Sequence, residues 1–190
     1  MEMMINYNLI LAKNQYLSTE RLLLRPVTLN DAEDMFEYAS DEETATYVFP
    51  VHYRIEDTEA SIAGYFIKDP LGKYGIELKE NGKMIGSIDL RVDETNRIAE
   101  IGYTLNKAYW GRGIVAEAGR TLIQLGFEKL NLVRVYAKYD IDNPNSGKVM
   151  DKLGMKEEGI IPNARISKGK IATDVIKGIT VRDWEDMNKQ

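Results

Sequence analysis

The spacing of apolar residues predicts a long amphipathic helix in the second half of the chain. Val115, Ala118, Leu122 and Leu125 recur at intervals of three and four residues, as on the buried face of a helix. We expect this helix to run from the residue after Gly113 to about position 129. Shorter helices are predicted over residues 32–39, 58–67 and 145–153.

Alternating apolar and polar positions predict the strands. They cover residues 22–24, 74–79, 83–92, 97–105, 133–137, 156–166 and 170–182. Asn81-Gly82 separates two of these segments and is typical of a tight hairpin turn. Strands come first and a strand–helix–strand–helix–strand unit follows, which indicates a mixed sheet with helices on both faces. Residues 1–16 are expected to be a short extension, partly ordered as a strand or arm.

The composition is that of a globular protein of one domain. The 190 residues are 44% hydrophobic and 29% charged, which is enough for a full core. The net charge of −5 argues against a nucleic-acid partner. No apolar run approaches the roughly 18–20 residues of a membrane span, and the first residues lack the features of a signal peptide. A cytoplasmic location without a membrane partner is therefore expected.

Cysteine and histidine are too scarce for several kinds of site. The chain has no cysteine and one histidine, His52. Disulfides, thiolate metal sites and a cysteine nucleophile are excluded, and we expect no metal site and no Ser-His-Asp triad. His52 lies in a Pro-Val-His-Tyr stretch and is expected to be a solvated loop residue.

A glycine-rich turn lies between a predicted strand and the long helix. Gly111 and Gly113 can adopt backbone angles that other residues avoid, and the first turn of a helix offers unpaired N–H groups with partial positive charge. A phosphate or pyrophosphate is expected to bind there; the alternative is an ordinary tight turn. The expected N–H donors are Arg112, Gly113, Ile114 and Val115. Ile114-Val115 stand where a P-loop has Lys-Ser/Thr, so the turn is not a P-loop.

The surroundings of this turn resemble a known family. Residues 99–119, AEIGYTLNKAYWGRGIVAEAG, resemble motif A of the GNAT superfamily of acyl-CoA N-acyltransferases, in particular its RimJ/RimL group, which acetylates ribosomal-protein N-termini. Residues 142–146 (DNPNS) and 152–155 (KLGM) are similar to the N-x-x-S and K-x-G-F parts of motif B. A start such as STERLLLRP at 18–26 is usual for the group. The resemblance spans roughly residues 17–184.

The resemblance implies the GNAT fold. This is an α/β (mixed α+β) fold of one domain, with a central, mostly antiparallel sheet of six or seven strands and helices on both faces. The fourth and fifth strands splay apart, and the acyl-CoA arm lies in the gap and pairs with the fourth strand like an added strand. The implied division is an extension at 1–16, the acetyltransferase domain at 17–184 and a tail at 185–190.

The resemblance also implies acetyl-CoA as the cofactor, with CoA as product. In this family the backbone of the fourth strand pairs with pantetheine, and the matching residues are Ile101, Gly102 and Tyr103. Asn143 either bonds the pantetheine amide or caps the helix that follows it. Lys148 and Lys152 on that helix either reach the ribose phosphate of the cofactor or are solvated.

Two residues are candidates for the proton transfers. Several GNAT enzymes carry a catalytic glutamate where Glu100 stands, and this carboxylate can take an amine proton directly or through water; otherwise it is a structural residue. RimL-type proteins have their base on a later segment, but the matching residue is Arg165, which cannot accept a proton at ordinary pH. Ser146 matches the serine that protonates the leaving thiolate in RimL-like proteins, or is only a helix-start residue. Met150 stands where other members have a tyrosine for this role.

The implied function is acetyl-CoA-dependent N-acetylation of a primary amine. The acceptor is either a peptide N-terminus, as in a ribosomal protein, or a small amine such as a polyamine or an aminoglycoside-like antibiotic. The aromatic residues of the loop at 41–55 either flank the acceptor or pack against the sheet. A non-catalytic acyl-CoA-binding or regulatory domain is the alternative. We expect a monomer or a homodimer.

Overall fold

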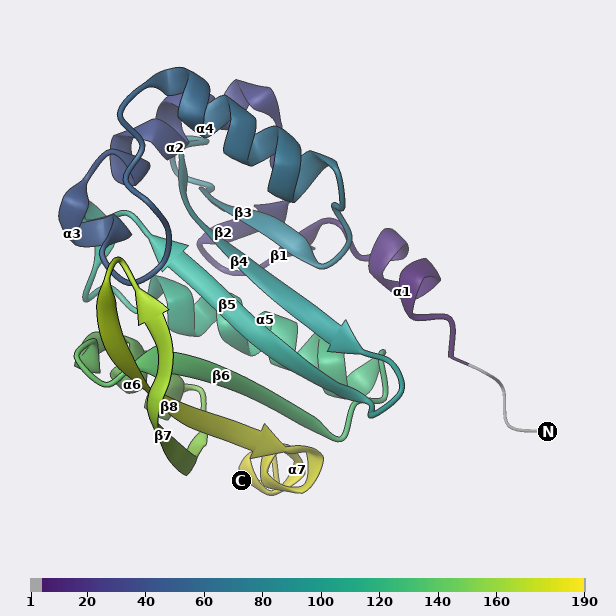
Figure 1. Cartoon of the computed structure of the whole chain (residues 1–190). Coiled ribbons are helices and arrows are strands. Elements are labelled where there is room, and N and C mark those ends of the chain that lie inside the picture. Colours follow the sequence, from purple (N-terminus) through teal and green to yellow (C-terminus); the bar gives the residue numbers. More distant parts are fainter. Residues whose placement is uncertain (1–4, 190) are drawn as a thin grey trace.

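The computed structural model describes residues 5–189, which form a single sheet with helices on both faces (Figure 1). The eight strands follow the order β1-β2-β3-β4-β5-β6-β8-β7. Their bounds are β1 Leu17–Ser18, β2 Leu22–Arg25, β3 Lys73–Leu78, β4 Met84–Asp93, β5 Ile98–Leu105, β6 Arg134–Asp140, β7 Lys156–Ser167 and β8 Lys170–Thr180. The predicted fold is confirmed, but the sheet has eight strands rather than six or seven, and one of them is the two-residue β1 at its edge.

The helices cover the two faces of the sheet unequally. They are α1 Tyr7–Lys13, α2 Ala32–Ala39, α3 Glu42–Ala45, α4 Ile55–Ser61, α5 Ile114–Glu128, α6 Pro144–Lys152 and α7 Val181–Met187, with the short turns η1 Leu29–Asp31, η2 Ile62–Ile67 (π-helical) and η3 Lys107–Tyr109. Helices α2 and α4 lie over one face, and α5 lies behind the other (Figure 1). Within residues 5–189, no helix has the length and apolar character to cross a membrane.

The main core lies between the sheet and α5. Val115, Ala118, Leu122 and Leu125 are all buried there, which confirms the helix face predicted from their spacing. Burial of such side chains is the main favourable term in folding, at roughly 1.5–3 kcal/mol for each large one. A smaller cluster under α2 and η2 fills the opposite face, so the sheet is held rigidly from both sides.

Neighbouring strands pair antiparallel except at one place. β5 pairs with β4 along its whole length. Its parallel pairing with β6 covers only Ile98–Glu100 against Arg134–Tyr136. Beyond these three residue pairs the two strands separate, as the resemblance implies for its fourth and fifth strands. The gap leaves one side of β5 without a strand partner from Ile101 onward.

The N-terminal segment is a helix rather than the expected strand or arm. The side chain of Asn6 accepts the N–H of Leu9 at 2.9 Å and so caps α1. Tyr7 and Leu11 are buried against the main core. Residues 1–4 of the predicted extension lie outside the described part of the chain. Packing of two apolar side chains, one turn apart, is what fixes this short helix.

Several element boundaries also differ from the prediction, including those of β6, which runs to Asp140, and the short helix α3 lies in the expected loop. Helix α4 begins at Ile55 rather than at residue 58, and residues 62–67 continue it as a π-helical turn. The last strand ends at Thr180, because Thr180 and Asp183 form a capping box that starts α7. Helix α7 reaches Met187, so part of the predicted tail is helical.

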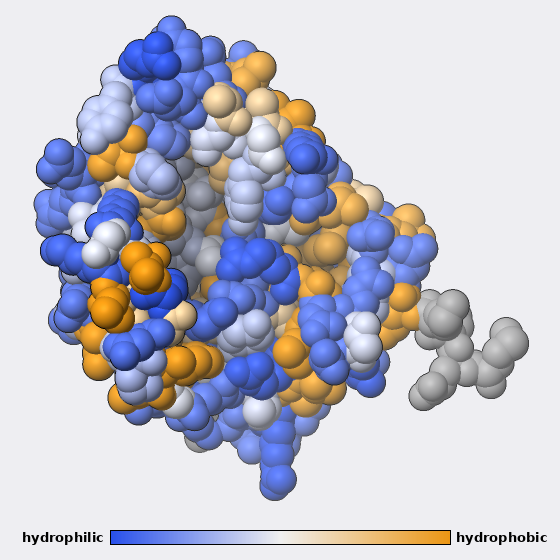
Figure 2. Space-filling model, viewed as in Figure 1, coloured by the Kyte–Doolittle hydropathy of each residue, from blue (hydrophilic) through white to orange (hydrophobic). Residues whose placement is uncertain are grey.

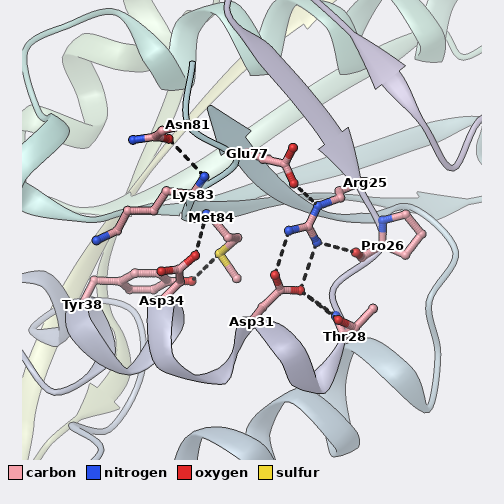
Figure 3. Close-up of polar contacts among 10 residues, drawn as sticks. All are labelled: Arg25, Pro26, Thr28, Asp31, Asp34, Tyr38, Glu77, Asn81, Lys83 and Met84. Atoms are coloured by element: carbon pink, nitrogen blue, oxygen red, sulfur yellow. Dashed lines mark hydrogen bonds and ion pairs between the residues drawn. The ribbon is translucent and has the colours of Figure 1, made fainter. Parts of the chain in front are cut away.

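Arg25 joins the sheet to the start of α2 (Figure 3). Its guanidinium donates to Asp31 (Nη2–Oδ1 2.7 Å) and to Glu77 (Nε–Oε2 2.5 Å). Asp31 in turn accepts the N–H of Thr28 at 2.8 Å. These contacts fix α2 over β2 and β3, and α2 thereby forms a stable wall for the cavity described next.

Candidate active site

The separation of β5 from β6 opens a cavity near the middle of the molecule. Strand pairing stops at Glu100 and Tyr136, and the cavity beyond has a volume of about 1150 Å³. Its walls come from β4, β5, β6, the starts of α5 and α6, and the segment between α2 and α4. Figure 2 shows a hollow on this face, below the surface formed by α2–α4. Ligand sites commonly have roughly 300–1,000 Å³, so this cavity can hold a large ligand and a second molecule.

The glycine turn forms one end of the cavity. Gly113 is the N-cap of α5, with φ 73°, a left-handed backbone that favours glycine. Gly113, Ile114, Val115 and Ala116 line the cavity, and no side chain of the described chain caps this helix end. The N–H groups of the first turn are therefore available to a ligand. Together with the helix dipole they fit an anion such as a pyrophosphate.

Arg21 fastens this turn from outside. It donates to the carbonyl of Arg112 (Nη1–O 3.0 Å) and to Glu117 in the first turn of α5 (Nε–Oε2 2.7 Å). The Arg112 side chain folds back to the carbonyl of Ala108 at 3.0 Å, with its guanidinium 5.1 Å from the ring centre of Tyr109. Arg112 thus lies outside the cavity lining, unlike the other three predicted donors.

Glu100 lies on the wall of the cavity at the last residue pair between β5 and β6. Its carboxylate is 3.2 Å from Arg91 Nη2 and 3.6 Å from Lys138 Nζ. It also accepts the hydroxyl of Tyr136 at 3.3 Å. The side chain is 23% exposed, so a second molecule in the cavity can reach it. The Glu100 carboxylate is thus flanked by two cationic side chains.

Ser146 lies in the first turn of α6, across the gap from β5. Its Oγ and its carbonyl oxygen each lie 2.9 Å from the hydroxyl of Tyr103. Asn143 is the N-cap of α6 and accepts the N–H of Ser146 at 3.4 Å. Burial raises the pKa of Tyr103. Met150, one turn later, is buried and brings no hydroxyl.

A polar cluster centred on Asp89 lies beside Glu100, and sequence reasoning missed it. Asp89 accepts the hydroxyl of Tyr65 and the guanidinium of Arg91, each at 2.5 Å. Burial raises the pKa of Asp89, and burial together with Asp89 raises the pKa of Tyr65 to about 12. A Cβ on Gly102 would lie 2.8 Å from Arg91 Nη1, so a larger residue there would displace the Arg91 guanidinium. Asp89 and Arg91 alternate with apolar residues as in any strand, so no sequence signal marks them.

The segment between α2 and α4 borders the cavity, and His52 lies in a loop as expected but is less solvated than predicted. Tyr47, Phe49 and His52 line the cavity. His52 is half-buried: its Nδ1 is 2.8 Å from Thr58 Oγ1 and its ring centre is 5.5 Å from that of Phe49. Burial lowers its pKa. The hydroxyl of Tyr47 donates to the carbonyl of Asp142 at 3.0 Å and so ties this segment to the far side of the gap.

Most of the predicted site residues meet at this one cavity. Those that line it are Glu100, Ile101, Gly102, Tyr103, Gly113, Ile114, Val115, Asn143, Ser146, Lys148 and Lys152. Arg165 lines it as well, with its Nε donating to Asp174 at 3.0 Å. A guanidinium held by a carboxylate keeps its proton, so Arg165 cannot act as the base at this position.

Comparisons with known proteins agree with this architecture. A family model described as an acetyltransferase (GNAT) domain matches residues 21–156. An uncharacterised N-acetyltransferase of Bacillus licheniformis, p20, is 34% identical over 173 residues, which are 88% of this chain and 97% of that protein. The ribosomal-protein-serine acetyltransferase of Escherichia coli (strain K12) is 33% identical over 112 residues, 57% of this chain and 62% of that protein.

A solved structure has the same fold. The microcin C7 self-immunity acetyltransferase MccE, in complex with acetyl-CoA and AMP, superposes with a TM-score of 0.76 at 23% identity. The match covers 85% of this chain and 93% of that one. At this identity the likeness concerns the fold alone.

Proposed function

Because the chain belongs to the GNAT acetyltransferase family, we propose that it moves the acetyl group of acetyl-CoA directly to the primary amine of a peptide N-terminus or a small molecule. The observation that carries this proposal is the gap between β5 and β6, with Glu100 on one wall and Ser146 on the other. Direct transfer needs no covalent enzyme intermediate, which suits a chain without cysteine.

The residues around the cavity fit acetyl-CoA, which supplies the activated acetyl thioester. The N–H groups of Gly113, Ile114 and Val115 hold the pyrophosphate. The side of β5 that lacks a strand partner, residues 101–103, pairs with the pantetheine arm. Lys148 and Lys152 lie on α6 at the cavity edge, where they hold the ribose phosphate.

Glu100 and Ser146 handle the two protons of the reaction. Glu100 takes a proton from the acceptor ammonium group, directly or through one water, and the neutral amine then attacks the acetyl carbon to form the C–N bond. The C–S bond breaks, and Ser146 gives its hydroxyl proton to the departing sulfur. Ser146 regains a proton through water from the nitrogen of the new amide, and Glu100 releases its proton to solvent, so that both residues return to their starting state.

A peptide N-terminus is the first acceptor to test. The E. coli relative is named for acetylating a ribosomal protein. Aromatic side chains of the segment between α2 and α4 also line the cavity, where they can contact an extended peptide. A small amine would occupy only the part near Glu100.

Glu100→Gln tests the base. The substitution keeps the shape of the side chain but removes the proton acceptor, so kcat at pH 7 should fall roughly 10²-fold or more. It should recover partly at high pH, where the acceptor amine is already neutral. Steady-state kinetics with acetyl-CoA and a panel of peptides, polyamines and aminoglycosides provide the measurement, with acetylated products identified by mass spectrometry.

Glu157→Gln is the matched control, because Glu157 is exposed on β7 and lies away from the cavity. It should turn over like the parent. A Glu100→Gln rate within a few-fold of the parent at every pH would show that water serves as the base. Binding of acetyl-CoA without product from any amine would favour a non-catalytic acyl-CoA-binding domain.

A further inference from the structure

Tyr103 and Ser146 form a bridge across the gap between β5 and β6. Tyr103 extends from β5, beyond the last residue pair with β6, and Ser146 begins α6 on the other side. Both polar contacts that the described chain gives to the Tyr103 hydroxyl are with Ser146, one to its carbonyl and one to its Oγ. Both residues line the cavity. The phenol is therefore placed to control the serine hydroxyl.

The Tyr103 hydroxyl proton can serve only one of these two contacts at a time. A tyrosine hydroxyl has one proton to donate, and a carbonyl can only accept. If Tyr103 donates to the Ser146 carbonyl, the contact between the two hydroxyls is a hydrogen bond only when Ser146 donates to the phenol oxygen. If Tyr103 donates to Ser146 Oγ instead, the serine proton is free to point into the cavity. The carbonyl oxygen and Oγ of Ser146 each lie 2.9 Å from the Tyr103 hydroxyl oxygen, so a rotation of the phenol O–H bond switches between these states.

We propose that Tyr103 is a positioning residue that donates to Ser146 Oγ and so aims the serine proton at the departing sulfur. This inference rests on the proposed role of Ser146 in acetyl transfer. Burial keeps the phenol protonated, because it raises the pKa of Tyr103 above its ordinary value near 10. Tyr103 thus remains a donor throughout the working pH range.

Tyr103→Phe removes only the hydroxyl and tests the proposal in a double-mutant cycle with Ser146→Ala. Tyr103→Phe should lower kcat about tenfold, with KM for acetyl-CoA within about twofold, because the interaction acts in the transition state. In the Ser146→Ala background it should have no further effect. Steady-state kinetics give kcat and KM of the parent, both single variants and the double variant, which complete the cycle.

Tyr74→Phe is the matched control. Tyr74 is a buried strand tyrosine whose hydroxyl donates to the carbonyl of Asn14 at 2.9 Å, outside the cavity. Its loss should lower the melting temperature but leave kcat unchanged. Two results would overturn the proposal. One is a Tyr103→Phe enzyme with the kcat of the parent although Ser146→Ala lowers kcat. The other is a double variant that is slower than Ser146→Ala alone. If Ser146→Ala matches the parent, the proposed role of Ser146 fails first.

A second measurement tests the proposal without removing the hydroxyl, so a loss of folding cannot explain the result. Trifluorotyrosine at position 103 keeps the shape of the side chain and lowers the pKa of the phenol. The phenolate cannot donate, so kcat should fall with rising pH at a pH where the parent is still fully active. A pH profile identical to that of the parent would overturn the proposal, because a merely structural tyrosine would also leave the profile unchanged.

Discussion

At the scale of single residues, a substitution at Gly113 should lower the affinity for acetyl-CoA more than it lowers the stability of the fold. A Cβ there meets no atom closer than Arg21 Nη2 at 3.9 Å, so the protein itself leaves the space open. Gly113→Asp should cost about 1–2 kcal/mol of stability for the left-handed backbone. It should also weaken acetyl-CoA binding at least about tenfold, because a carboxylate repels the pyrophosphate at the helix start. Calorimetric titration measures the affinity.

Gly82→Asp separates these two effects. Gly82 has φ 71° and open space around it, in the turn between β3 and β4. The same substitution there brings the same charge and similar backbone strain but lies outside the cavity. It should leave the affinity for acetyl-CoA unchanged. Equal losses of affinity in the two variants would mean that strain or net charge, and not the phosphate site, is responsible.

At the scale of elements, α7 depends on an ionised cap. Asp183 accepts a hydrogen bond from Lys156 at 2.5 Å and the hydroxyl of Thr180 at 2.6 Å. These bonds lower its pKa to about 2. Trp184, next in the chain, packs 6.0 Å from Phe127 between ring centres. The cap therefore holds the end of the chain against α5.

The pH dependence of this cap follows from the sign of the pKa shift. A lowered pKa in the folded state contributes stability that is complete above the unfolded value near 3.9 and is lost as the pH falls through about 2. Asp183→Asn should therefore be less stable than the parent at pH 7, and the difference should shrink between pH 4 and pH 2. Urea unfolding at several pH values measures it. Asp186→Asn removes an exposed charge of the same helix, and a similar trend in that variant would refute a specific role of the cap.

At the scale of the whole molecule, the gap divides the sheet into two parts that are joined by little strand pairing, although both pack against α5 in one core. β5 and β6 share three residue pairs, and beyond them Tyr103–Ser146 and Tyr47–Asp142 are the cross-gap hydrogen bonds described above. A ligand between the two parts should stabilise both. At a hundredfold excess over Kd, binding contributes about 2.7 kcal/mol to the folded state.

Hydrogen exchange can locate this stabilisation. Acetyl-CoA should slow exchange of those amides of residues 101–105 that point away from β4 into the gap, and of residues 113–116 at the start of α5. Amides of the hairpin between β3 and β4 should change little. ATP, which lacks the pantetheine arm, should add no protection at residues 101–105. Equal protection of residues 101–105 by ATP, or none by acetyl-CoA, would contradict pairing of this edge with pantetheine.

Sequence alone determined the elements whose signals are local. The period of α5, the glycine at its start and the Asn81-Gly82 turn each depend on neighbours within a few residues, and such signals survive without knowledge of the fold. The order of strands and helices then limited the sheet to few arrangements. The family motifs added Glu100 and Ser146, whose roles stay predictions.

Tertiary structure decided what depends on partners far apart in the chain. Tyr103 and Ser146 are 43 residues apart, and Tyr65 and Asp89 are 24 apart. No local pattern marks a tyrosine whose hydroxyl will meet a serine on another element. The Tyr103–Ser146 contact depends on how β5 and α6 lie across the gap, and the Tyr65–Asp89 contact depends on how η2 packs over β4. Helix α1 was missed for the same reason, because two apolar residues in a short segment become a helix only when a core is present to bury them.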